Sequence, residues 1–595
     1  MKPTRCVFSL TVIVICSQLY SLNTSEYDRA YQYLNTRNEV YFAIYPNSPA
    51  DLKLLINDLS SIDRIDEGNK VIAYANKKDF EKFLKYNLKY EVLLPPCFQN
   101  IAPMSDYKDY LNARRNGLKK TVTHGNWLAY PTYDAYVQIM TQFQTSFPNL
   151  AKLVVLGNSI QGRQVLGLKV TNNVNASNGK PRFLQTATVH GDEVLNYINS
   201  LHMIDTLLDR YGLDTRLTRL LDNIEFWFVP LYNPDGTYRG GNNTVQSAQR
   251  YNQNGVDLNR NYPCPCGQTG NHALYGLYTS REPENAAVFN LWQKYVFHLS
   301  TDQHGGTETV LWPYAAISRR PCDEAWYIWA AKRYVDTVHK ACNNNGYMTS
   351  CGGDGMGNIF SELYECHGTS IDYSLFYNRG RPLPMETSIT KLVPASSIVT
   401  YWGYNKEAMI QFYELLLTGI QGTVKNSVTK APILHAKINE TTHDFDSAWS
   451  YTDTAGFYLR FILLGTWNLT FSAPGYVSKT IAITVSSYGV KYPLDVELDP
   501  VGTAVSDRVF FSLRISKIVP YSNGIRIDFG SAPASARVCI YSMDGSLVRQ
   551  LTAASVSSIL WDGTDGSRRV VRNGCYVIKV TSAAGKASKS FVMNR

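Results

Sequence analysis

The fold is decided by one stretch, Phe183-Leu184-Gln185-Thr186-Ala187-Thr188-Val189-His190-Gly191-Asp192-Glu193. Its first seven residues are mostly apolar or β-branched, which predicts a buried strand that ends at Val189. A helical pattern follows from Asn196 to Tyr211, so the stretch has the strand-then-helix order of an α/β domain. His190 and Glu193 are three residues apart at the expected helix start, which predicts that both side chains lie on one side of its first turn.

Three further apolar runs predict strands of the same sheet. They are Leu153–Leu156, Val165–Val170 and Ile224–Leu231, and they are nearly continuous, as expected where both faces of a sheet are covered. A second helical pattern runs from Glu282 to Val296. Residues 119–417 therefore predict an α/β domain with a mixed, mostly parallel central sheet flanked by helices.

The chain before residue 119 predicts a smaller α/β unit. Its elements alternate in the order β-α-β-α-β, with strands at Val40–Ile44, Val71–Tyr74 and Tyr90–Leu94 and helices at Ser48–Leu59 and Lys78–Tyr86. Such a unit in front of an enzyme domain suggests a propeptide over residues 23–118. The basic pairs Arg114-Arg115 and Lys119-Lys120 are the expected cleavage points.

The chain after residue 417 changes to short strands and turns. Turn signals such as Ala473-Pro474-Gly475-Tyr476 predict a β-sandwich over residues 418–500. Residues 506–595 repeat the pattern, with Asp562-Gly563-Thr564-Asp565-Gly566 between alternating strands, and predict a second β-sandwich.

The start of the chain and its charge limit the compartment and the partners. Residues 1–22 are typical of a secretory signal, because Lys2 and Arg5 precede the apolar run Val7–Cys16, far shorter than the roughly 20 residues of a membrane span. No later run is long and apolar enough to span a bilayer, so we expect a secreted chain. The net charge of +9 is scattered over 595 residues, which argues against a nucleic-acid surface.

The cysteines are compatible with export. Removal of Cys6 and Cys16 with the signal leaves 9 of the 11 cysteines, an odd number, so at least one thiol is free or paired between chains. Cys264-Pro-Cys266 has no partner pair at zinc-finger spacing, and we expect a disulfide or buried thiol there rather than half a metal site.

A second histidine strengthens the metal hypothesis. The predicted strand Leu299–His304 ends in His304 and is followed by two glycines. His190, Glu193 and His304 supply three protein ligands, and three ligands plus an open position are the pattern of catalytic zinc. Asp302 or a backbone carbonyl is expected to orient one of these ligands.

Residues 119–417 resemble the zinc carboxypeptidases related to carboxypeptidase A, the M14 or funnelin group. The resemblance is carried by ordered motifs, and we expect peptides with a free C-terminus as substrates and one zinc ion per chain. The motifs are His190-Gly191-Asp192-Glu193, Asn233-Pro234-Asp235-Gly236, Asp257-Leu258-Asn259-Arg260-Asn261-Tyr262-Pro263, His304 with Trp312-Pro313-Tyr314, Tyr364 with Gly368-Thr369-Ser370-Ile371-Asp372, and Met385-Glu386-Thr387-Ser388.

The resemblance implies a role for each site residue. His190, Glu193 and His304 match the zinc ligands, Glu386 the general acid/base and Arg250 the arginine that polarises the scissile carbonyl. The residues that match the substrate-binding positions are Asn259 and Arg260, which grip the terminal carboxylate, Tyr364, which closes over the substrate, Arg163, an accessory arginine of the groove, and Ile371, at the floor of the S1′ pocket.

Ile371 predicts the side-chain preference. An acid at this position would favour Lys or Arg at the C-terminus, whereas Ile resembles the variants that prefer apolar or aromatic residues. Ala315 also looks like pocket floor and is neutral, while Gly305-Gly306 replace bulkier residues and would open the groove.

The two C-terminal sandwiches carry weaker resemblances. Residues 418–500 are similar to the transthyretin-like domain that follows some carboxypeptidases, through Thr454-Ala455-Gly456-Phe457 and Gly475-Tyr476. Residues 506–595 are similar to FlgD-like or type IX sorting domains of secreted bacterial proteins, through Trp561-Asp562-Gly563 and Asn573-Gly574-Cys575-Tyr576. This implies bacterial export, surface retention and an interaction with secretion machinery.

Three other readings stay open at this point. The same scaffold could trim peptidoglycan peptides by cutting bonds to a diamino acid. A zinc deacylase would share the His190 and Glu193 spacing without keeping Asn259, Arg260 and Tyr364 together. A non-catalytic peptide-binding protein would be favoured by loss of Glu386 or of a zinc ligand, and neither is lost.

Overall fold

A computed structural model describes residues 25–59, 61–110, 127–176, 179–265, 281–351, 356–501 and, with short gaps, 515–593. The expected secretory signal, both dibasic pairs and Cys266 lie outside these residues. Within them, none of the helices combines the length and the apolarity that crossing a membrane requires. The described part divides into two compact units, one that ends at Val501 and one that begins after it.

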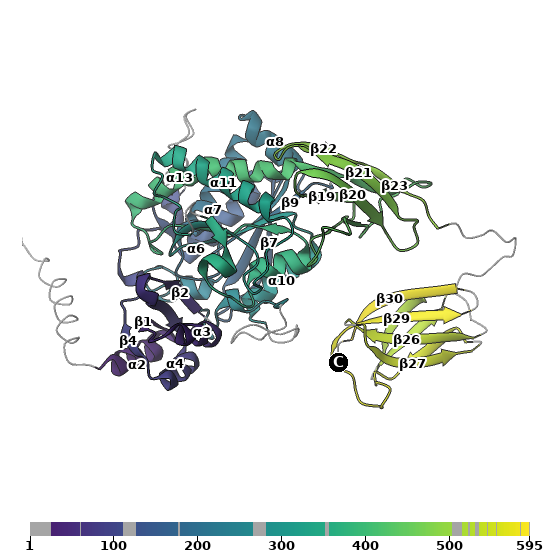
Figure 1. Cartoon of the computed structure of the whole chain (residues 1–595), viewed down its shortest axis with the longest axis horizontal. Helices are drawn as coiled ribbons and strands as arrows, with labels where there is room; N and C mark the ends of the chain where they lie inside the picture. The colour runs from purple at the N-terminus through teal and green to yellow at the C-terminus, as the bar shows by residue number, and fades with distance from the viewer. Residues whose placement is uncertain are drawn as a thin grey trace, which may run out of the picture. The chain divides into compact units, whose positions relative to one another are not determined.

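The N-terminal domain is an antiparallel four-stranded sheet with helices on one side (Figure 1). Its strand order is β2-β3-β1-β4, and a cluster around Phe42, Phe80 and Phe83 forms its own core. The sequence prediction missed the first helix, α2, and strand β2, since both are polar and only partly buried. The elements are α2 (Glu26–Arg37), β1 (Val40–Tyr45), α3 (Pro49–Asp58), β2 (Ser61–Ile65), β3 (Val71–Ala75), α4 (Lys77–Phe83) and β4 (Lys89–Val92).

A nine-stranded mixed sheet forms the centre of the next domain, which confirms the predicted mixed α/β class. The strand order is β13-β12-β15-β11-β9-β10-β8-β7, with β14 beside β11. The adjacent pairs β10-β9, β9-β11 and β11-β15 are parallel. The pairs β7-β8, β8-β10 and β15-β12 are antiparallel. The strands are β7 (Ala151–Asn158), β8 (Gln164–Val170), β9 (Arg182–Ala187), β10 (Glu225–Val229), β11 (Leu299–His304), β12 (Glu308–Trp312), β13 (Met356–Asn358), β14 (Arg381–Pro382) and β15 (Met385–Thr387).

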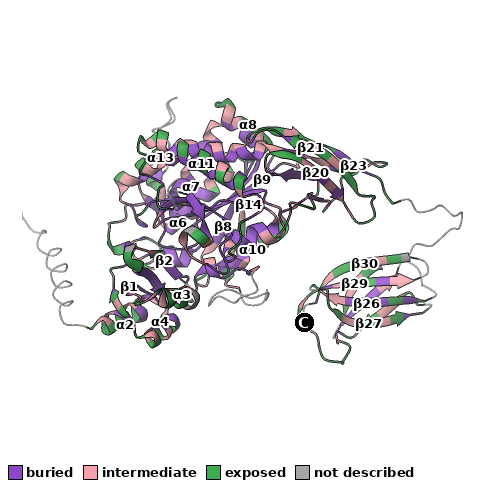
Figure 2. Ribbon diagram, viewed as in Figure 1, coloured by how far each residue is buried: buried purple, intermediate pink, exposed green. Residues whose placement is uncertain are grey.

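Helices pack on this sheet and bury it (Figure 2). One apolar cluster contains residues of α6, α7, α8, α11 and α13, and a second contains residues of α10. The near-continuous apolar strands are thereby covered on both faces, as their composition indicates. The helices are α6 (Tyr133–Ser146), α7 (Leu195–Arg210), α8 (Thr215–Asn223), α9 (Pro234–Thr237), α10 (Pro283–Lys294), α11 (Glu324–Cys342), α12 (Ser370–Tyr373) and α13 (Ala395–Glu414).

The segment after α13 folds into two sheets that share a core. One contains β19, β16, β22 and β23, the other has the order β18-β17-β20-β21, and Val424, Tyr458 and Phe471 lie between them. The strands are β16 (Gly419–Asn426), β17 (Lys437–Asn439), β18 (Ser450–Tyr451), β19 (Phe457–Arg460), β20 (Gly465–Ser472), β21 (Lys479–Val485), β22 (Lys491–Pro493) and β23 (Val496–Leu498).

The second compact unit is all-β. Its sheets have the orders β24-β25-β28 and β27-β26-β29-β30, and Trp561, Ile527 and Ile578 belong to its core. The strands are β24 (Ile515–Tyr521), β25 (Gly524–Phe529), β26 (Ala536–Ser542), β27 (Leu547–Ala553), β28 (Ser558–Trp561), β29 (Gly574–Ser582) and β30 (Gly585–Met593).

Candidate active site

The polar side chains of the site come from strands that end at one edge of the central sheet. β9, β11 and β15 are parallel neighbours, so their carboxyl ends meet. The register pairs Thr186 with Asp302 and His304 with Glu386. Residues that are 116 and 82 positions apart in sequence are therefore side by side, as expected for a site at the carboxyl edge of an α/β sheet.

A strained turn places His190. Strand β9 ends at Ala187, two residues earlier than predicted, because Thr188 has φ 57°, in the left-handed region that a β-branched residue rarely adopts. Its hydroxyl accepts a hydrogen bond from Tyr232 N at 3.1 Å, which ties the turn to the next loop. Helix α7 begins only at Leu195, so the prediction of a helical turn is wrong. His190 and Glu193 close a tight turn instead, with Glu193 N donating to His190 O at 3.2 Å.

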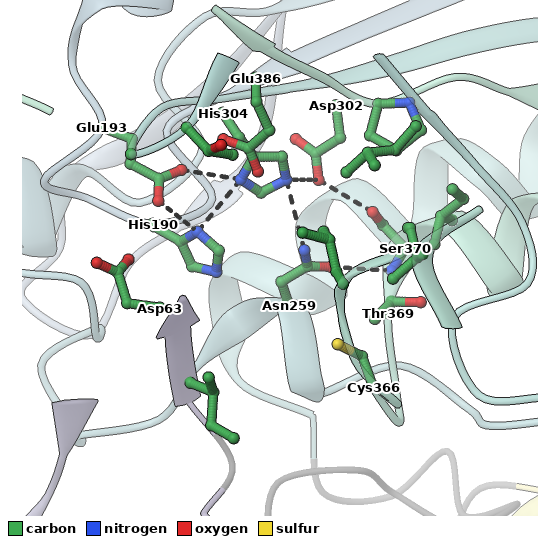
Figure 3. Close-up of a pocket in the computed structure, with 18 of the residues that line it drawn as sticks. Asp63, His190, Glu193, Asn259, Asp302, His304, Cys366, Thr369, Ser370 and Glu386 are labelled. Atoms are coloured by element: carbon green, nitrogen blue, oxygen red, sulfur yellow. Dashed lines mark hydrogen bonds and ion pairs between the residues drawn. The ribbon is translucent and has the colours of Figure 1, made fainter. Parts of the chain in front are cut away.

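Three candidate metal ligands converge at this point (Figure 3). Nδ1 of His190 lies 3.0 Å from Glu193 Oε1 and 3.2 Å from His304 Nδ1, and His304 Nδ1 lies 2.8 Å from Glu193 Oε2. Tetrahedral zinc with bonds of roughly 2.1 Å holds its ligand atoms about 3.4 Å apart. The donor set and its spacing therefore fit one zinc ion with an open position for substrate or water.

Each imidazole is oriented from behind by a carboxylate. His190 Nε2 lies 3.3 Å from Asp257 Oδ1, and His304 Nε2 lies 3.4 Å from Asp302 Oδ2. Such contacts fix the tautomer, so that Nδ1 faces the metal. The contact of Asp302 is the one that the sequence predicts. The role of Asp257 was missed, although its place two residues before Asn259 could have indicated it.

Glu386 faces the ligand triangle from β15 (Figure 3). Burial raises the pKa of its carboxyl to about 8, with His304 lowering that pKa and Glu193 raising it further. A carboxyl whose pKa is poised near neutrality can accept a proton and later return it.

The guanidinium groups line the same cleft. Arg250 donates from Nε to Asp257 Oδ2 at 3.0 Å, and its Nη1 lies 3.6 Å from Glu193 Oε1. Arg260 is 6% exposed and donates from Nη1 to the carbonyl of Asn259 at 2.9 Å. Both arginines and Asn259 belong to the lining of the cleft together with the candidate metal ligands.

One end of the cleft is apolar. Leu311, Ala315, Ile359 and Ile371 belong to one buried cluster, with Tyr364 packed against it. Ile371 is the second residue of α12, whose first turn is capped by the hydroxyl of Thr369. Ile371, which lines the cleft, is thus continuous with other aliphatic side chains.

Arg163 lies apart from the other expected site residues. Its Nη1 is 2.7 Å from Asp235 Oδ1, and its Nε donates to Asn242 Oδ1 at 2.9 Å. It belongs to the loop that follows β7, and it is not part of the cleft lining within the described residues. Its expected contact with substrate stays a prediction.

The N-terminal domain enters the cleft. Ile62 and Asp63 of β2 line it, Tyr364 donates its hydroxyl to the carbonyl of Ile62, and Ser61 donates to Asp257 Oδ2 at 2.6 Å. The sequence prediction missed Ser61, Ile62 and Asp63, because β2 itself was not predicted.

Lys391 is a further cation of the site that the sequence prediction missed. It follows Glu386 by five residues and is 3% exposed. Burial lowers its pKa, but the carboxylates of Asp192, Asp63 and Glu193 more than compensate, and the pKa lies well above its ordinary value. The ammonium is therefore charged.

Comparisons with known proteins relate the chain to carboxypeptidases. Residues 136–408 match the model of the family described as zinc carboxypeptidase. The chain is 27% identical over 365 residues to human carboxypeptidase D. The aligned region covers 59% of this chain and 25% of carboxypeptidase D. The chain is 28% identical over 394 residues to the catalytic chain of mouse carboxypeptidase N, covering 60% and 83% respectively. A solved carboxypeptidase A from Helicoverpa armigera has a TM-score of 0.47 and 19% identity, covering 64% of this chain and 98% of that one. The match thus spans a quarter of the length of carboxypeptidase D.

Proposed function

Because residues 136–408 form a domain of the zinc carboxypeptidase family, we propose that this chain removes single residues from the free C-terminus of peptides. The observation that supports it best is the convergence of His190, Glu193 and His304 beside Glu386, within a cleft that also contains Arg260. The ligand triangle provides for hydrolysis, and the arginine restricts it to chain ends.

The proposed chemistry divides between the metal and Glu386. When bound by His190, Glu193 and His304, zinc supplies a Lewis acid that lowers the pKa of a water toward about 7. Glu386 takes the proton of the attacking water and delivers it to the leaving amine. Arg250, buried beside the ligands, donates to the carbonyl oxygen as negative charge develops on it.

The substrate's terminal carboxylate is assigned to Asn259, Arg260 and Tyr364. A planar guanidinium matches a carboxylate in two parallel hydrogen bonds, so Arg260 measures the distance from the chain end to the metal. Ile371 and the aliphatic cluster around it support a preference for apolar or aromatic C-terminal side chains. Both oxygens of Asp302, another residue of the cleft lining, accept hydrogen bonds from Thr186 and Ser370, which makes this acid a weaker partner for Lys or Arg.

The other parts of the chain complete the proposal. The N-terminal domain would act as a propeptide, since Ile62 and Asp63 occupy the cleft and Tyr364 is bonded to it. Residues 1–22 would direct export. The sandwich over 418–500 would support the enzyme as a transthyretin-like domain, and residues 506–595 would engage secretion machinery.

A pair of peptides tests the proposed function. The full chain, nicked with trypsin in the segment 111–126, is offered one peptide with a free C-terminus and the same peptide amidated. We expect cleavage of the free peptide alone and its loss in the presence of a zinc chelator. Equal cleavage of both peptides would show that Arg260 does not select substrates by their free C-terminal carboxylate.

Glu386→Gln tests the proton transfer. The amide keeps the shape of the side chain but cannot accept a proton, so we expect kcat to fall by about 10²–10⁴-fold while zinc content is unchanged. Turnover near the wild-type level would exclude Glu386 as the base.

A further inference from the structure

Lys391 is paired across a domain boundary. Its Nζ lies 2.7 Å from Asp63 Oδ1 of strand β2, and both side chains are almost completely buried. The ring of Tyr74, on β3 of the same N-terminal domain, lies 4.7 Å from Nζ. The N-terminal domain thus supplies both a counter-charge and an aromatic cover for this ammonium group.

On its own domain, Lys391 has partners that are committed elsewhere. Nζ lies 3.2 Å from Glu193 Oε1, a candidate metal ligand, and 3.7 Å from Asp192 Oδ2, which accepts a hydrogen bond from Tyr74 at 2.6 Å. If the N-terminal domain leaves, Asp63 and Tyr74 go with it. A buried ammonium group is then left facing the cleft without its shortest ion pair, an unfavourable state unless another anion replaces it.

Glycine makes room for such an anion. Gly306 has φ 120°, and a Cβ added there would lie 2.8 Å from Cε of Lys391 and 3.6 Å from Asp63 Oδ1. A side chain at this position would therefore clash with the Lys391 side chain and would adjoin the space that the Asp63 carboxylate fills. The place beside Lys391 is filled by the Asp63 carboxylate, which lines the cleft together with Gly306, so departure of Asp63 would open a space of carboxylate size there.

The position of this opening indicates which part of a peptide reaches it. Asp63 lies on the side of His190 and Glu193, whereas Asn259, Thr369 and Ser370 lie beyond His304 (Figure 3). The proposed function places the C-terminal residue on the latter side, with Arg260 and Ile371. We therefore expect the chain upstream of the scissile bond to leave past the place that Asp63 fills, beside its partner Lys391.

We propose that Lys391 forms an anion subsite for an acidic side chain upstream of the scissile bond, and that Asp63 occupies this subsite in the uncleaved chain. The proposal rests on the proposed function, which it extends from the C-terminal residue to the residues before it. The favoured substrates are peptides with an apolar C-terminal residue preceded at short distance by Glu or Asp.

A scan of Glu positions tests the subsite. Peptides ending in Phe carry one Glu at the first, second or third position before the Phe, each with a matched Gln peptide. For the trypsin-nicked chain we expect kcat/KM at one position to be about tenfold higher with Glu than with Gln, as for a hydrogen bond to a charged group. Lys391→Met should reduce that ratio to one, and Lys391→Arg should keep it.

The ratio separates this proposal from the proposed function. Cleavage of the Gln peptides alone bears on the proposed function, whereas the Glu-to-Gln ratio within one variant bears on Lys391. A ratio of one at all three positions, or an unchanged ratio in Lys391→Met, would overturn the subsite. The same ratio measured as dissociation constants on the nicked Glu386→Gln variant by calorimetry gives the answer without turnover.

The uncleaved full chain tests the occupancy by Asp63. Asp63→Asn keeps the size of the side chain and removes its charge, so we expect the affinity of the uncleaved chain for the preferred Glu peptide to rise at least about tenfold. Asp66→Asn is the matched control, since Asp66 is an exposed acid on the same segment that pairs with Arg64 at 2.9 Å. Equal affinities of the two variants would show that Asp63 does not block the subsite.

Discussion

The two domains that flank the catalytic domain are attached to it in different ways. The N-terminal domain keeps its own core around Phe42 and meets its neighbour through ion pairs such as Asp63 with Lys391 and through a small apolar cluster that joins Tyr74 to Tyr251. The sandwich after α13 instead contributes Phe457, Leu459 and Phe461 to the main apolar cluster of the catalytic domain. The difference indicates that separating the N-terminal sheet opens only a small apolar cluster, whereas separating the sandwich opens the main apolar cluster of the catalytic domain.

Buried ion pairs cross the second interface as well. Arg460 of the sandwich is completely buried, donates to Asp323 at 2.9 Å and pairs with Asp444. Arg182 of the catalytic domain pairs with Asp453 of the sandwich at 3.0 Å. Removal of the sandwich would leave such groups without partners in a site that water reaches poorly, which is strongly destabilising.

The largest expected effect comes from one aromatic truncation on each side. Phe42→Ala and Phe461→Ala remove buried rings that are 0% and 3% exposed, and each should cost about 3–5 kcal/mol. We expect Phe42→Ala to melt the N-terminal domain alone and to give activity without proteolysis. Phe461→Ala should lower the melting transition of the catalytic domain.

Calorimetry with a simultaneous activity assay distinguishes the two outcomes. If both variants lose the catalytic transition together, the N-terminal domain is as integral as the sandwich, and the contrast between the two attachments is wrong.

Arg460→Met sharpens the contrast at the second interface. It leaves Asp444 and part of Asp323 uncompensated, so the free energy of unfolding should fall by about 3–5 kcal/mol. The control Lys430→Met breaks an exposed pair with Glu497 and should change it by about 0–1 kcal/mol. Urea unfolding measures both, and similar losses would mean that the interface ion pairs contribute no more than surface ones.

A smaller, pH-dependent effect is expected at the first interface. Glu39 accepts hydrogen bonds from the backbone of Arg250 and Tyr251, and burial raises its pKa from 4.5 to about 7, with Arg37 acting in the opposite direction. Because the folded form holds the proton of Glu39 more tightly than the unfolded form, the contribution of Glu39 to stability is greatest below about pH 4.5. This contribution is lost as the pH rises to about 7. The loss should not exceed about 3 kcal/mol.

Glu39→Gln isolates this contribution. Melting of the N-terminal domain, followed between pH 4.5 and 8, should lose part of its pH dependence in the variant. The buried carboxyls of Glu284 and Asp372 in the catalytic domain also titrate in this range, with pKa values raised by burial to about 7 and about 6, so the difference between the two proteins is the quantity to compare. Identical profiles would contradict the assignment.

The sequence predicted what is local in the chain. Apolar periodicity located the central strands and helices, and the polar residues at the ends of β9 and β11 located the candidate ligands His190 and His304. The end of β9 was misplaced because Thr188 adopts a left-handed conformation that its residue type disfavours. Nothing in the pattern of a β-branched run indicates such a turn, which is stabilised by Tyr232 from another loop.

The parts of the site that were not predicted depend on contacts between distant segments. Asp63, Tyr74 and Lys391 lie in no recognisable motif. Their contacts form only where the N-terminal and catalytic domains meet. Arg163 shows the converse, since a short motif placed it in the groove while the fold ties it to Asp235. A motif therefore predicts where a residue lies along the fold, but not which neighbouring residue its side chain contacts.

Asp302 connects the helix that carries Ile371 to the candidate metal ligand His304. One of its oxygens accepts from Ser370 at 3.0 Å, at the start of the short helix that also carries Ile371, and the same oxygen lies 3.4 Å from Nε2 of His304. Redesign of that helix to accept other side chains would therefore also shift the imidazole. Engineered variants with a new preference should be screened for zinc affinity as well as for rate, because a gain in one property can conceal a loss in the other.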